Sequence, residues 1–296
     1  MSCNSYSQKY TEIIGDMKRG TAMTSRYIFL DVDGTLVTRQ GVLPDSAKNA
    51  IHKAKQNGHK VFLCTGRAKG QIPEMLWKLQ FDGVICSAGA YIEADGEIIR
   101  DIPMPKESVR ALMTYLKSQH IDYVYETIKG ITGGQKMCSF LQNCLDEMKK
   151  HNPKLPDDFV GILNVEDAWD YKEPVYKLLY FAEEFLSEQV MQELKSKYTV
   201  VKNTLSFAGE ASSGEISALN MNKALGIKCI MNYYGRDIED TVAFGDGAND
   251  YEMLAAANVG VAMGNSEQGL KDMADIVTAS VDEDGLYKGF VSAGLI

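Results

Sequence analysis

The sequence predicts an α/β protein with a parallel sheet, interrupted by an inserted module of a different kind. From residue 26 to residue 86, short apolar runs typical of strands alternate with helical patterns. This alternation is typical of right-handed βαβ units, which build parallel sheets. The same rhythm returns after Ser213. Between the two parts the expected strands are longer and half polar, which favours a separate α+β module with helices on one face of its sheet.

The first expected strand is the apolar run 27–30, which is followed directly by Asp31, Asp33 and Gly34. A run that is apolar on both faces is typical of a buried parallel strand. The carboxyl ends of such strands line the crevice in which open α/β sheets bind ligands. Two carboxylates this close repel each other, so they need a cation or a shared proton. The structural alternative is an ordinary Asp-Gly turn.

The next stretch continues the alternation. A helix with one apolar face is expected after Pro44, and Gly58 is expected to end it. A second buried strand, 60–64, leads into Thr65-Gly66-Arg67, and a helical stretch is then expected to reach Gln80. Residues 83–86 have the composition of a third strand. These elements extend the parallel sheet.

The predicted insert follows a hairpin over 91–104, which turns at Asp95-Gly96. Its expected strands are 121–127 and 175–181, and its expected helices cover 109–116 and 140–148. We therefore expect a core domain formed by residues 24–104 and 203–296, and a cap formed by residues 105–202. Residues 1–23 are expected to form a flexible N-terminal extension.

Composition limits the possible partners. The chain has 296 residues and a net charge of −9 with no basic tract, which argues against a nucleic-acid partner. No apolar stretch approaches the roughly 18 residues of a membrane span, and the first 23 residues lack the apolar region of a signal peptide. The six cysteines form no CxxC pair. We expect a reduced, cytoplasmic protein, monomeric or homodimeric, without a membrane partner.

A second acidic cluster follows the expected strand 241–245. It reads Asp246-Gly247-Ala248-Asn249-Asp250, and its structural alternative is a turn that caps the next helix. Together, Asp31, Asp33 and Asp246 would supply the hard oxygen ligands that suit Mg²⁺. Thr65 and nearby backbone amides could donate to a phosphate, and a lysine would then be needed to balance the charge.

These motifs resemble those of the haloacid dehalogenase-like superfamily and, within it, the Cof-type phosphatases of subfamily IIB. Residues 31–35 match the first motif, residues 65–67 resemble the second, and residues 246–250 match the fourth. Lys223 stands where the lysine of the third motif is expected. The resemblance extends from Arg26 to the C-terminus, and it implies a Rossmann-like core with an inserted α/β cap.

Two positions depart from the family pattern. Ala224 follows the lysine where the family usually has glycine, which leaves Lys228 as a second candidate. Residues 88–90 read Ala-Gly-Ala, where Cof-type relatives often have Asn-Gly-Ala. The missing amide leaves the choice of substrate open, although it does not change the reaction that the resemblance implies.

The resemblance implies an Mg²⁺-dependent phosphomonoester hydrolase that acts on a small phosphorylated metabolite. Asp31 would be the nucleophile and form an aspartyl-phosphate, and Asp33 would act as general acid and then as general base. The Asp31 carboxylate, the Asp33 backbone carbonyl and the Asp246 carboxylate would hold the metal.

The remaining implied roles concern the phosphoryl group. Thr65 and Lys223 would hold its oxygens where charge develops, with help from Gly66 and Asn249. Asp250, together with Asn249, would orient Lys223 and the waters of the metal.

Two rival functions follow from the same motifs. A phosphomutase of the superfamily would need cap arginines for a second phosphate, and Arg110 is the sole arginine between residues 101 and 202. A non-catalytic phosphate-binding regulatory module would not need a nucleophile and an acid.

The substrate stays open among sugar phosphates, pyridoxal phosphate, flavin mononucleotide and nucleotides. Lys177 and the glycine-rich segment 129–134 are candidates for contact with it. Their structural alternatives are a charge at a strand edge and a plain hairpin turn.

Overall fold

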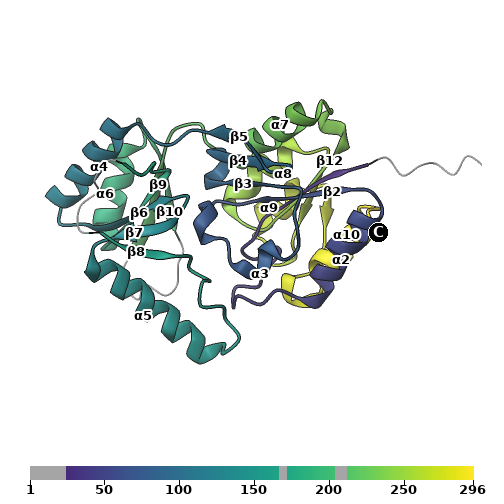
Figure 1. Cartoon of the computed structure of the whole chain (residues 1–296), viewed down its shortest axis with the longest axis horizontal. Coiled ribbons are helices and arrows are strands. Elements are labelled where there is room, and N and C mark those ends of the chain that lie inside the picture. The colour runs from purple at the N-terminus through teal and green to yellow at the C-terminus, as the bar shows by residue number, and fades with distance from the viewer. Residues whose placement is uncertain (1–24, 167–171, 204–211) are drawn as a thin grey trace, which may run out of the picture.

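The computed structural model describes residues 25–166, 172–203 and 212–296, so the expected N-terminal extension over 1–23 lies outside the described residues. The described chain forms two sheets, one of eight strands and one of six, in two parts that lie beside each other (Figure 1). The predicted α/β class with a parallel sheet and an insert is confirmed. None of the helices in these residues is long and apolar enough to cross a bilayer.

The core sheet has the strand order β14-β13-β12-β1-β2-β3-β4-β5. Its strands are β1 (Tyr27–Leu30), β2 (Lys60–Cys64), β3 (Gly83–Cys86), β4 (Tyr91–Ala94), β5 (Glu97–Asp101), β12 (Thr241–Gly245), β13 (Val259–Ala262) and β14 (Ile276–Val277). The strands from β14 to β3 in this order pair in parallel with their neighbours. The pairs β3–β4 and β4–β5 are antiparallel and form a meander at the edge of the sheet. The turn at Asp95 and Gly96 has positive φ at both residues, as the hairpin motif predicts.

The register of β1 positions the site. Leu30 pairs with Leu63 of β2 on one side and with Phe244 of β12 on the other. Because three adjacent parallel strands end at the same edge, the residues that follow them meet in one crevice. These residues are Asp31, Thr65 and Asp246.

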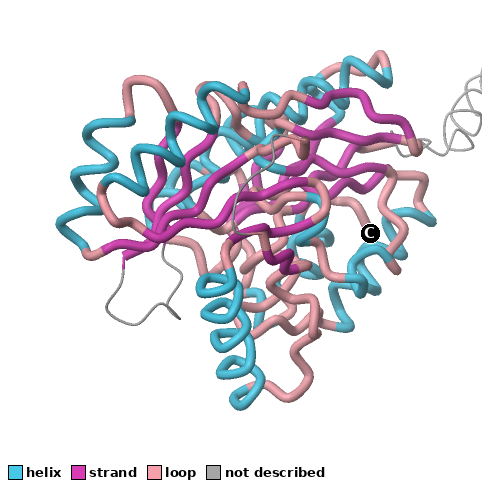
Figure 2. The backbone as a smooth tube through the Cα atoms, turned by 60° about the vertical axis from the view of Figure 1, so that its left-hand side comes forward, coloured by secondary structure: helices cyan, strands magenta, loops and turns pink. Residues whose placement is uncertain are grey.

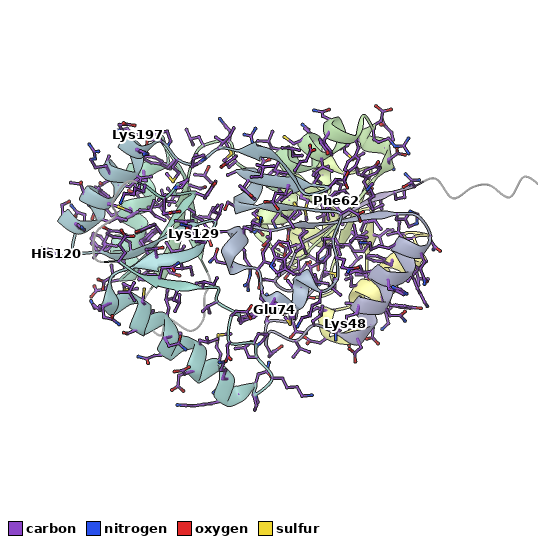
Figure 3. All side chains as sticks on the ribbon, viewed as in Figure 1. Lys48, Phe62, Glu74, His120, Lys129 and Lys197 are labelled. Carbon is purple, nitrogen blue, oxygen red and sulfur yellow. The ribbon has the colours of Figure 1, made fainter. Side chains whose placement is uncertain are left out.

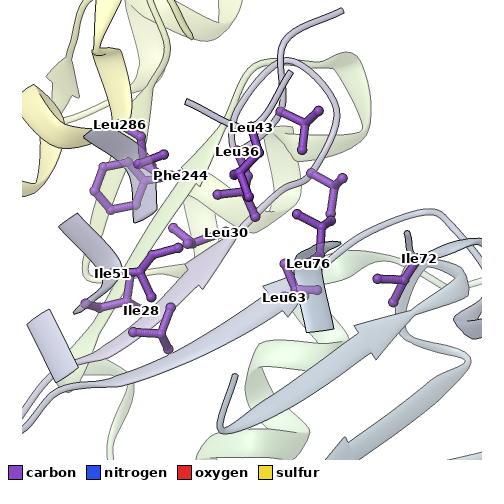
Figure 4. Packing of buried hydrophobic residues seen from close by; sticks show 14 of the residues in the cluster. Ile28, Leu30, Leu36, Leu43, Ile51, Leu63, Ile72, Leu76, Phe244 and Leu286 are labelled. Atoms are coloured by element: carbon purple, nitrogen blue, oxygen red, sulfur yellow. The ribbon is translucent and has the colours of Figure 1, made fainter. Parts of the chain in front are cut away.

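Helices cover both faces of the core sheet, which explains why its strands are apolar on both sides. One face packs against α2 (Asp45–Gln56) and α10 (Gly285–Ser292), and Figure 4 shows Ile28, Leu30 and Ile51 in that cluster. The other face packs against α7 (Lys223–Tyr234), α8 (Tyr251–Ala256) and α9 (Gln268–Met273). The predicted helix end at Gly58 is confirmed, because this residue follows the α2 cap with a φ of +85°.

The long helix expected up to Gln80 is wrong. The chain instead forms a short 3₁₀ turn, η1 (Lys69–Gln71), and one helical turn, α3 (Glu74–Trp77). Pro73 has no amide hydrogen and forces Ile72 into an extended conformation, so a helix cannot run through this point. The residues after Thr65 are therefore a loop that is free to contact the insert.

The insert forms the second sheet, with the strand order β10-β11-β9-β6-β7-β8. Its strands are β6 (Asp122–Thr127), β7 (Gly130–Gly133), β8 (Leu163–Val165), β9 (Lys177–Ala182), β10 (Thr199–Asn203) and β11 (Ser212–Ser217). The central pairs β6–β9 and β9–β11 are antiparallel. The segment 129–134, for which a plain hairpin turn was the alternative, therefore contributes β7.

Helices lie on both faces of this sheet, so the expectation of one covered face is wrong (Figure 2). The helices α4 (Lys106–Ser118) and α6 (Glu184–Leu194) pack with Leu178 and Tyr180. The helix α5 (Gln135–His151) packs with Leu179 and Phe181, which point the other way because side chains alternate along a strand. The part of this second face that α5 does not cover carries polar residues of β6, β9 and β11.

The predicted cap boundary at residue 202 is too early. Strand β11 pairs with both β9 and β10, so residues 212–217 belong to the second sheet rather than to the core. The sequence Ser-Ser-Gly-Glu-Ile-Ser has too few apolar residues to be recognised as a strand. We therefore propose that the cap runs from about residue 105 to about residue 217.

Core and cap also share buried contacts. Leu155 and Phe159 of the cap belong to the same apolar cluster as the core sheet. They pack so closely over Gly41 that a Cβ atom there would lie 2.0 Å from Leu155 Cδ1. This packing holds the cap against the core near the ends of β1 and β2.

Candidate active site

Two adjacent strand ends bring the first and fourth motifs together. Asp31 follows β1, and its amide donates to the carbonyl of Phe244 in β12 at 3.0 Å. Asp246 follows β12, and both carboxylates are buried. Carboxylate oxygens of Asp31, Asp246 and Asp250 lie within 4.8 Å of one another. The acidic residues of two distant segments therefore form one site.

The buried carboxylates of this site carry more negative charge than the described side chains balance, which favours binding of a cation. Burial, and then the charge of Asp250, raise the pKa of Asp31 well above its usual value. Burial also raises the pKa of Asp246 to about 6. Lys223 balances one of the three carboxylates, so an excess of buried negative charge is left. Hard carboxylate oxygens in this arrangement fit a bound Mg²⁺.

Asp246 is held by two neighbours. Thr35 Oγ1 donates to its Oδ1 at 3.2 Å, and Asn265 Nδ2 donates to its Oδ2 at 3.0 Å. Asn265 also donates to the carbonyl of Gly34, where a Cβ atom would lie 2.2 Å from Asp246 Oδ2. The glycine of the first motif is thus needed because Asp246 occupies the space beside it. Asn265 belongs to none of the predicted motifs, and its one signal in the sequence is its place shortly after strand β13.

Lys223, at the first turn of α7, lies between the two acidic segments. Its Nζ is 2.5 Å from Asp31 Oδ1 and 2.6 Å from Asp250 Oδ1, and its side chain is completely buried. Although burial opposes its charge, the carboxylates of Asp250 and Asp31 raise the pKa of Lys223. The alternative lysine, Lys228, is exposed on the same helix. The geometry therefore favours Lys223, and Asn222 starts the helix by accepting a bond from the Leu225 amide.

Asp250 and Asn249 differ in position. The Oδ2 atom of Asp250 accepts from the amides of Asp246 and Gly247, each at 2.9 Å, while its Oδ1 accepts from Lys223. Asp250 therefore orients both the loop and the lysine. Asn249 is exposed and lies beside Gly66, since a Cβ atom at Gly66 would be 3.6 Å from Asn249 Nδ2.

Asp33 is turned away from the carboxylate group and towards Arg67. Arg67 Nε donates to Asp33 Oδ2 at 2.8 Å and Nη2 donates to Oδ1 at 2.7 Å. Arg67 Nη1 donates to the carbonyls of Gln71 and Phe159. Half of the Asp33 side chain is exposed, and the burial of the other half opposes ionisation of the carboxyl group. The Arg67 guanidinium outweighs this effect and lowers the pKa of Asp33.

The second motif forms the opposite wall. Thr65 is buried, and its Oγ1 accepts from the Arg67 amide at 3.1 Å. Ser87, Ala88 and Gly89 follow β3 with positive φ angles. This tight turn carries the Ala-Gly-Ala step, and the Ala88 amide donates to the Thr65 carbonyl at 3.1 Å. Through this hydrogen bond the turn holds the backbone of Thr65, which is a candidate for phosphate binding.

The two cap candidates have different surroundings. Lys177 is buried in the central strand β9, and its Nζ donates to the Gly66 carbonyl at 3.0 Å, so it is not a charge at a strand edge. The segment that begins at Lys129 instead packs on η1, where a Cβ atom on Gly70 would lie 2.3 Å from the backbone of Lys129 and Gly130. Lys129 is labelled in Figure 3, and its Nζ forms an ion pair with Glu173 of the cap at 2.5 Å.

The chain is similar to known proteins over most of its length. The model of the haloacid dehalogenase-like hydrolase family matches residues 28–290. The chain is 28% identical to pyridoxal phosphate phosphatase YbhA of Escherichia coli (strain K12), over 93% of this chain and 100% of that protein. It is also 28% identical to 5-amino-6-(5-phospho-D-ribitylamino)uracil phosphatase YwtE of Bacillus subtilis (strain 168), over 88% of this chain and 94% of that protein.

A solved structure has the same fold. The subclass IIB sugar phosphatase BT4131 is 27% identical, with a TM-score of 0.74 over 92% of this chain and 100% of its own. Fold and site together define an α/β hydrolase with buried carboxylates at the ends of parallel strands. The chain belongs to the haloacid dehalogenase-like hydrolase family. The predicted class of enzyme, a phosphatase of this superfamily, is confirmed.

Proposed function

We propose that this protein is an Mg²⁺-dependent phosphomonoester hydrolase that forms an aspartyl-phosphate on Asp31. The observation that carries the proposal is the position of the Asp31 carboxylate, which is buried beside Asp246 and bound by Lys223. A carboxylate in this position is a nucleophile whose charge is balanced by groups that also attract a phosphate.

The residues present fit the metal that this chemistry requires. Asp31, Asp246 and the backbone carbonyl of Asp33 would hold Mg²⁺, and Asp250 would support them through Lys223 and the amides of residues 246 and 247. When bound there, Mg²⁺ neutralises phosphate charge so that an anionic carboxylate can approach phosphorus.

Asp31 then attacks phosphorus, and the bond from phosphorus to the leaving oxygen breaks. Lys223 holds both Asp31 and a phosphoryl oxygen in place, and the Thr65 hydroxyl and Gly66 amide bind further oxygens. Asn249, which lies beside Gly66, can donate to the same group. A second step, in which water attacks phosphorus, regenerates Asp31 and releases phosphate.

Asp33 transfers the protons. In the first step it protonates the leaving oxygen, and in the second it takes a proton from the attacking water. Arg67 fixes the orientation of its carboxylate through two hydrogen bonds. Since Arg67 also binds the Phe159 carbonyl in the cap, the proton donor is tied to the position of the cap.

The substrate is a small phosphorylated metabolite, as it is for the relatives named for pyridoxal phosphate and for a ribitylamino-uracil phosphate. Sugar phosphates and flavin mononucleotide belong to the same range of candidates. Arg110, which a phosphomutase would need near the site, is exposed on α4, on the far face of the cap sheet. Arg110 therefore cannot bind a second phosphate at the proposed site from this position, which argues against a phosphomutase.

The test is phosphate release from p-nitrophenyl phosphate by the purified protein, with and without Mg²⁺. We expect release that depends on Mg²⁺ and is abolished in Asp31→Asn. Brief incubation with substrate followed by acid quenching should add one phosphoryl group to the peptide that contains Asp31, as measured by mass spectrometry. No release under any metal condition would leave the non-catalytic phosphate-binding module as the function.

A further inference from the structure

Three charged residues form a cluster on the face of the cap sheet that α5 leaves uncovered. Lys177 Nζ donates to Glu215 Oε2 at 2.9 Å and lies 3.4 Å from Glu126 Oε2. Glu126 and Lys177 are almost completely buried, with exposed side-chain fractions of 1% and 8%, while Glu215 is one-third exposed. Buried charges of this kind are costly to desolvate and are rarely kept for stability alone.

The register of the cap sheet explains why these residues meet. Glu126 of β6 and Lys177 of β9 are direct cross-strand partners. Glu215 of β11 stands two residues before Ser217, which is the other direct partner of Lys177, so all three side chains point to one face. These strands are central in the sheet, and the cluster is therefore held on a rigid frame.

The cluster lies against the proposed phosphoryl site. Lys177 Nζ donates to the Gly66 carbonyl at 3.0 Å, one residue from Thr65. Gln71 Nε2 donates to Glu126 Oε1 at 3.2 Å, and the carbonyl of Gln71 accepts from Arg67, which holds Asp33. Asp33 protonates the leaving oxygen in the proposed reaction. The part of the substrate beyond that oxygen would therefore extend towards the cluster.

One atom of the cluster lacks a hydrogen bond. Glu126 Oε2 is buried, and its contact with Lys177 Nζ at 3.4 Å is an ion pair without the geometry of a hydrogen bond. Burial raises the pKa of Glu126 to about 7, so it can accept or donate to a ligand at neutral pH. A buried carboxylate oxygen in a single long ion pair can still accept a hydrogen bond, which a ligand hydroxyl would donate.

Resting on the proposed function, we propose that Glu126, Lys177 and Glu215 bind the leaving group of the substrate and select one that is uncharged and rich in hydroxyl groups. A hydroxyl can donate to a carboxylate and accept from an ammonium, so neighbouring hydroxyls of a sugar or polyol match the cluster. With both glutamates ionised the cluster has a net charge of −1, and with Glu126 protonated it is neutral. In neither state is there a spare cation for a second phosphate or a carboxylate.

The test compares substrates that share the phosphoryl group but differ in the leaving group. The probes are p-nitrophenyl phosphate, glucose 6-phosphate and glucose 1,6-bisphosphate, assayed by kcat/KM. The wild-type enzyme should prefer glucose 6-phosphate to the bisphosphate by about tenfold or more. Glu215→Gln and Glu126→Gln should each lose about tenfold more activity towards glucose 6-phosphate than towards the aryl phosphate, the effect of one lost hydrogen bond to a charged group.

A charge reversal sharpens the experiment. Glu215→Lys should lower the ratio of kcat/KM for glucose 6-phosphate to kcat/KM for the bisphosphate, because it gives the cluster a net positive charge. Lys136→Met, which removes an exposed cap lysine, is the matched control and should leave all three ratios unchanged. Circular dichroism confirms that each variant is folded.

The outcomes separate the two proposals. An active wild-type enzyme whose substrate ratios are unchanged in Glu215→Gln, Glu126→Gln and Glu215→Lys would overturn the assignment of the cluster and leave the phosphatase intact. A wild-type enzyme that prefers the bisphosphate would overturn it as well. Failure to release phosphate from any probe would instead contradict the proposed function itself.

Discussion

Arg67 and Asp33 form a bidentate pair in which two guanidinium nitrogens donate to the two carboxylate oxygens, at 2.8 and 2.7 Å. The same guanidinium donates to the Phe159 carbonyl and lies over the Phe159 ring, 4.9 Å from its centroid. The proposed proton donor of the core is therefore joined to the cap through one side chain. Loss of this side chain should affect both proton transfer and orientation.

Arg67→Met should raise the pKa of Asp33, since the guanidinium is what lowers it in the folded protein. A general acid works only while it is protonated, so the alkaline limb of the kcat/KM profile should move to higher pH. We also expect kcat to fall about tenfold or more because the carboxylate loses its fixed orientation. The control is Arg236→Met, a more exposed arginine of the core. If the alkaline limb of the Arg67→Met profile stays at the wild-type pH, Arg67 does not set the pKa of the general acid.

Asp31→Asn should abolish turnover while the protein stays folded, because an amide cannot form the acyl-phosphate. Burial and the Asp250 charge raise the pKa of Asp31, so the site disfavours its charged form when no metal is bound. The melting temperature without Mg²⁺ should accordingly stay level or rise, even though the contact with Lys223 is weakened. Thermal melts in chelator, beside a phosphate-release assay, measure both effects. Wild-type turnover in this variant would remove Asp31 as the nucleophile.

Asp246→Ala should raise the Mg²⁺ concentration needed for half-maximal activity and lower the maximal rate. The substitution removes a hard oxygen ligand and also the partner of Thr35 and Asn265. Titration of phosphate release against Mg²⁺ measures the change. Lys228→Ala, at an exposed position of α7, is the control. If the titration curves of Asp246→Ala and wild type overlay, Asp246 is not a metal ligand.

Gly70→Ala should displace the cap from the core. A Cβ atom at this position would lie 2.3 Å from Gly130 N and from the carbonyl carbon of Lys129, the peptide bond that leads into β7, so these atoms cannot move without shifting the start of that strand. We expect kcat/KM for a bulky metabolite phosphate to fall about tenfold, with a smaller loss for p-nitrophenyl phosphate, because cap contacts orient the larger leaving group. Lys129→Ala, which shortens the exposed side chain and keeps the backbone contact, should behave like wild type. Equal losses on both substrates would speak against a specificity role for this contact.

Glu126 should make the stability of the protein depend on pH. Its pKa is raised to about 7 in the folded state, so its contribution to stability is complete at pH values below its unfolded pKa. That contribution is lost as pH rises towards 7, at up to about 1.4 kcal/mol per pH unit. The free energy of unfolding of wild type, relative to Glu126→Gln, should therefore fall from about pH 4.5 to pH 7. Urea unfolding at several pH values tests this, and a flat difference would show that folding does not raise the pKa of Glu126.

Local sequence was sufficient for the core. The apolar runs of β1, β2 and β12 each lead into residues of the proposed site, and adjacent parallel strands bring such ends to one edge. The hairpin at Asp95-Gly96 and the helix end at Gly58 follow from the backbone freedom that these residues need or tolerate. These elements can be predicted from the sequence without knowledge of distant contacts, because their own residues favour one conformation or form a strand that is apolar on both sides.

Tertiary structure alone decided the rest. Strand β11 has a polar sequence and forms because it pairs with β9 and β10. The cluster of Glu126, Lys177 and Glu215 joins three strands that are up to 89 residues apart in the chain, and the choice of Lys223 over Lys228 depends on which side of α7 faces Asp31. Such contacts depend on strand order and helix rotation, which are set by how the whole core packs and leave no local pattern in the sequence.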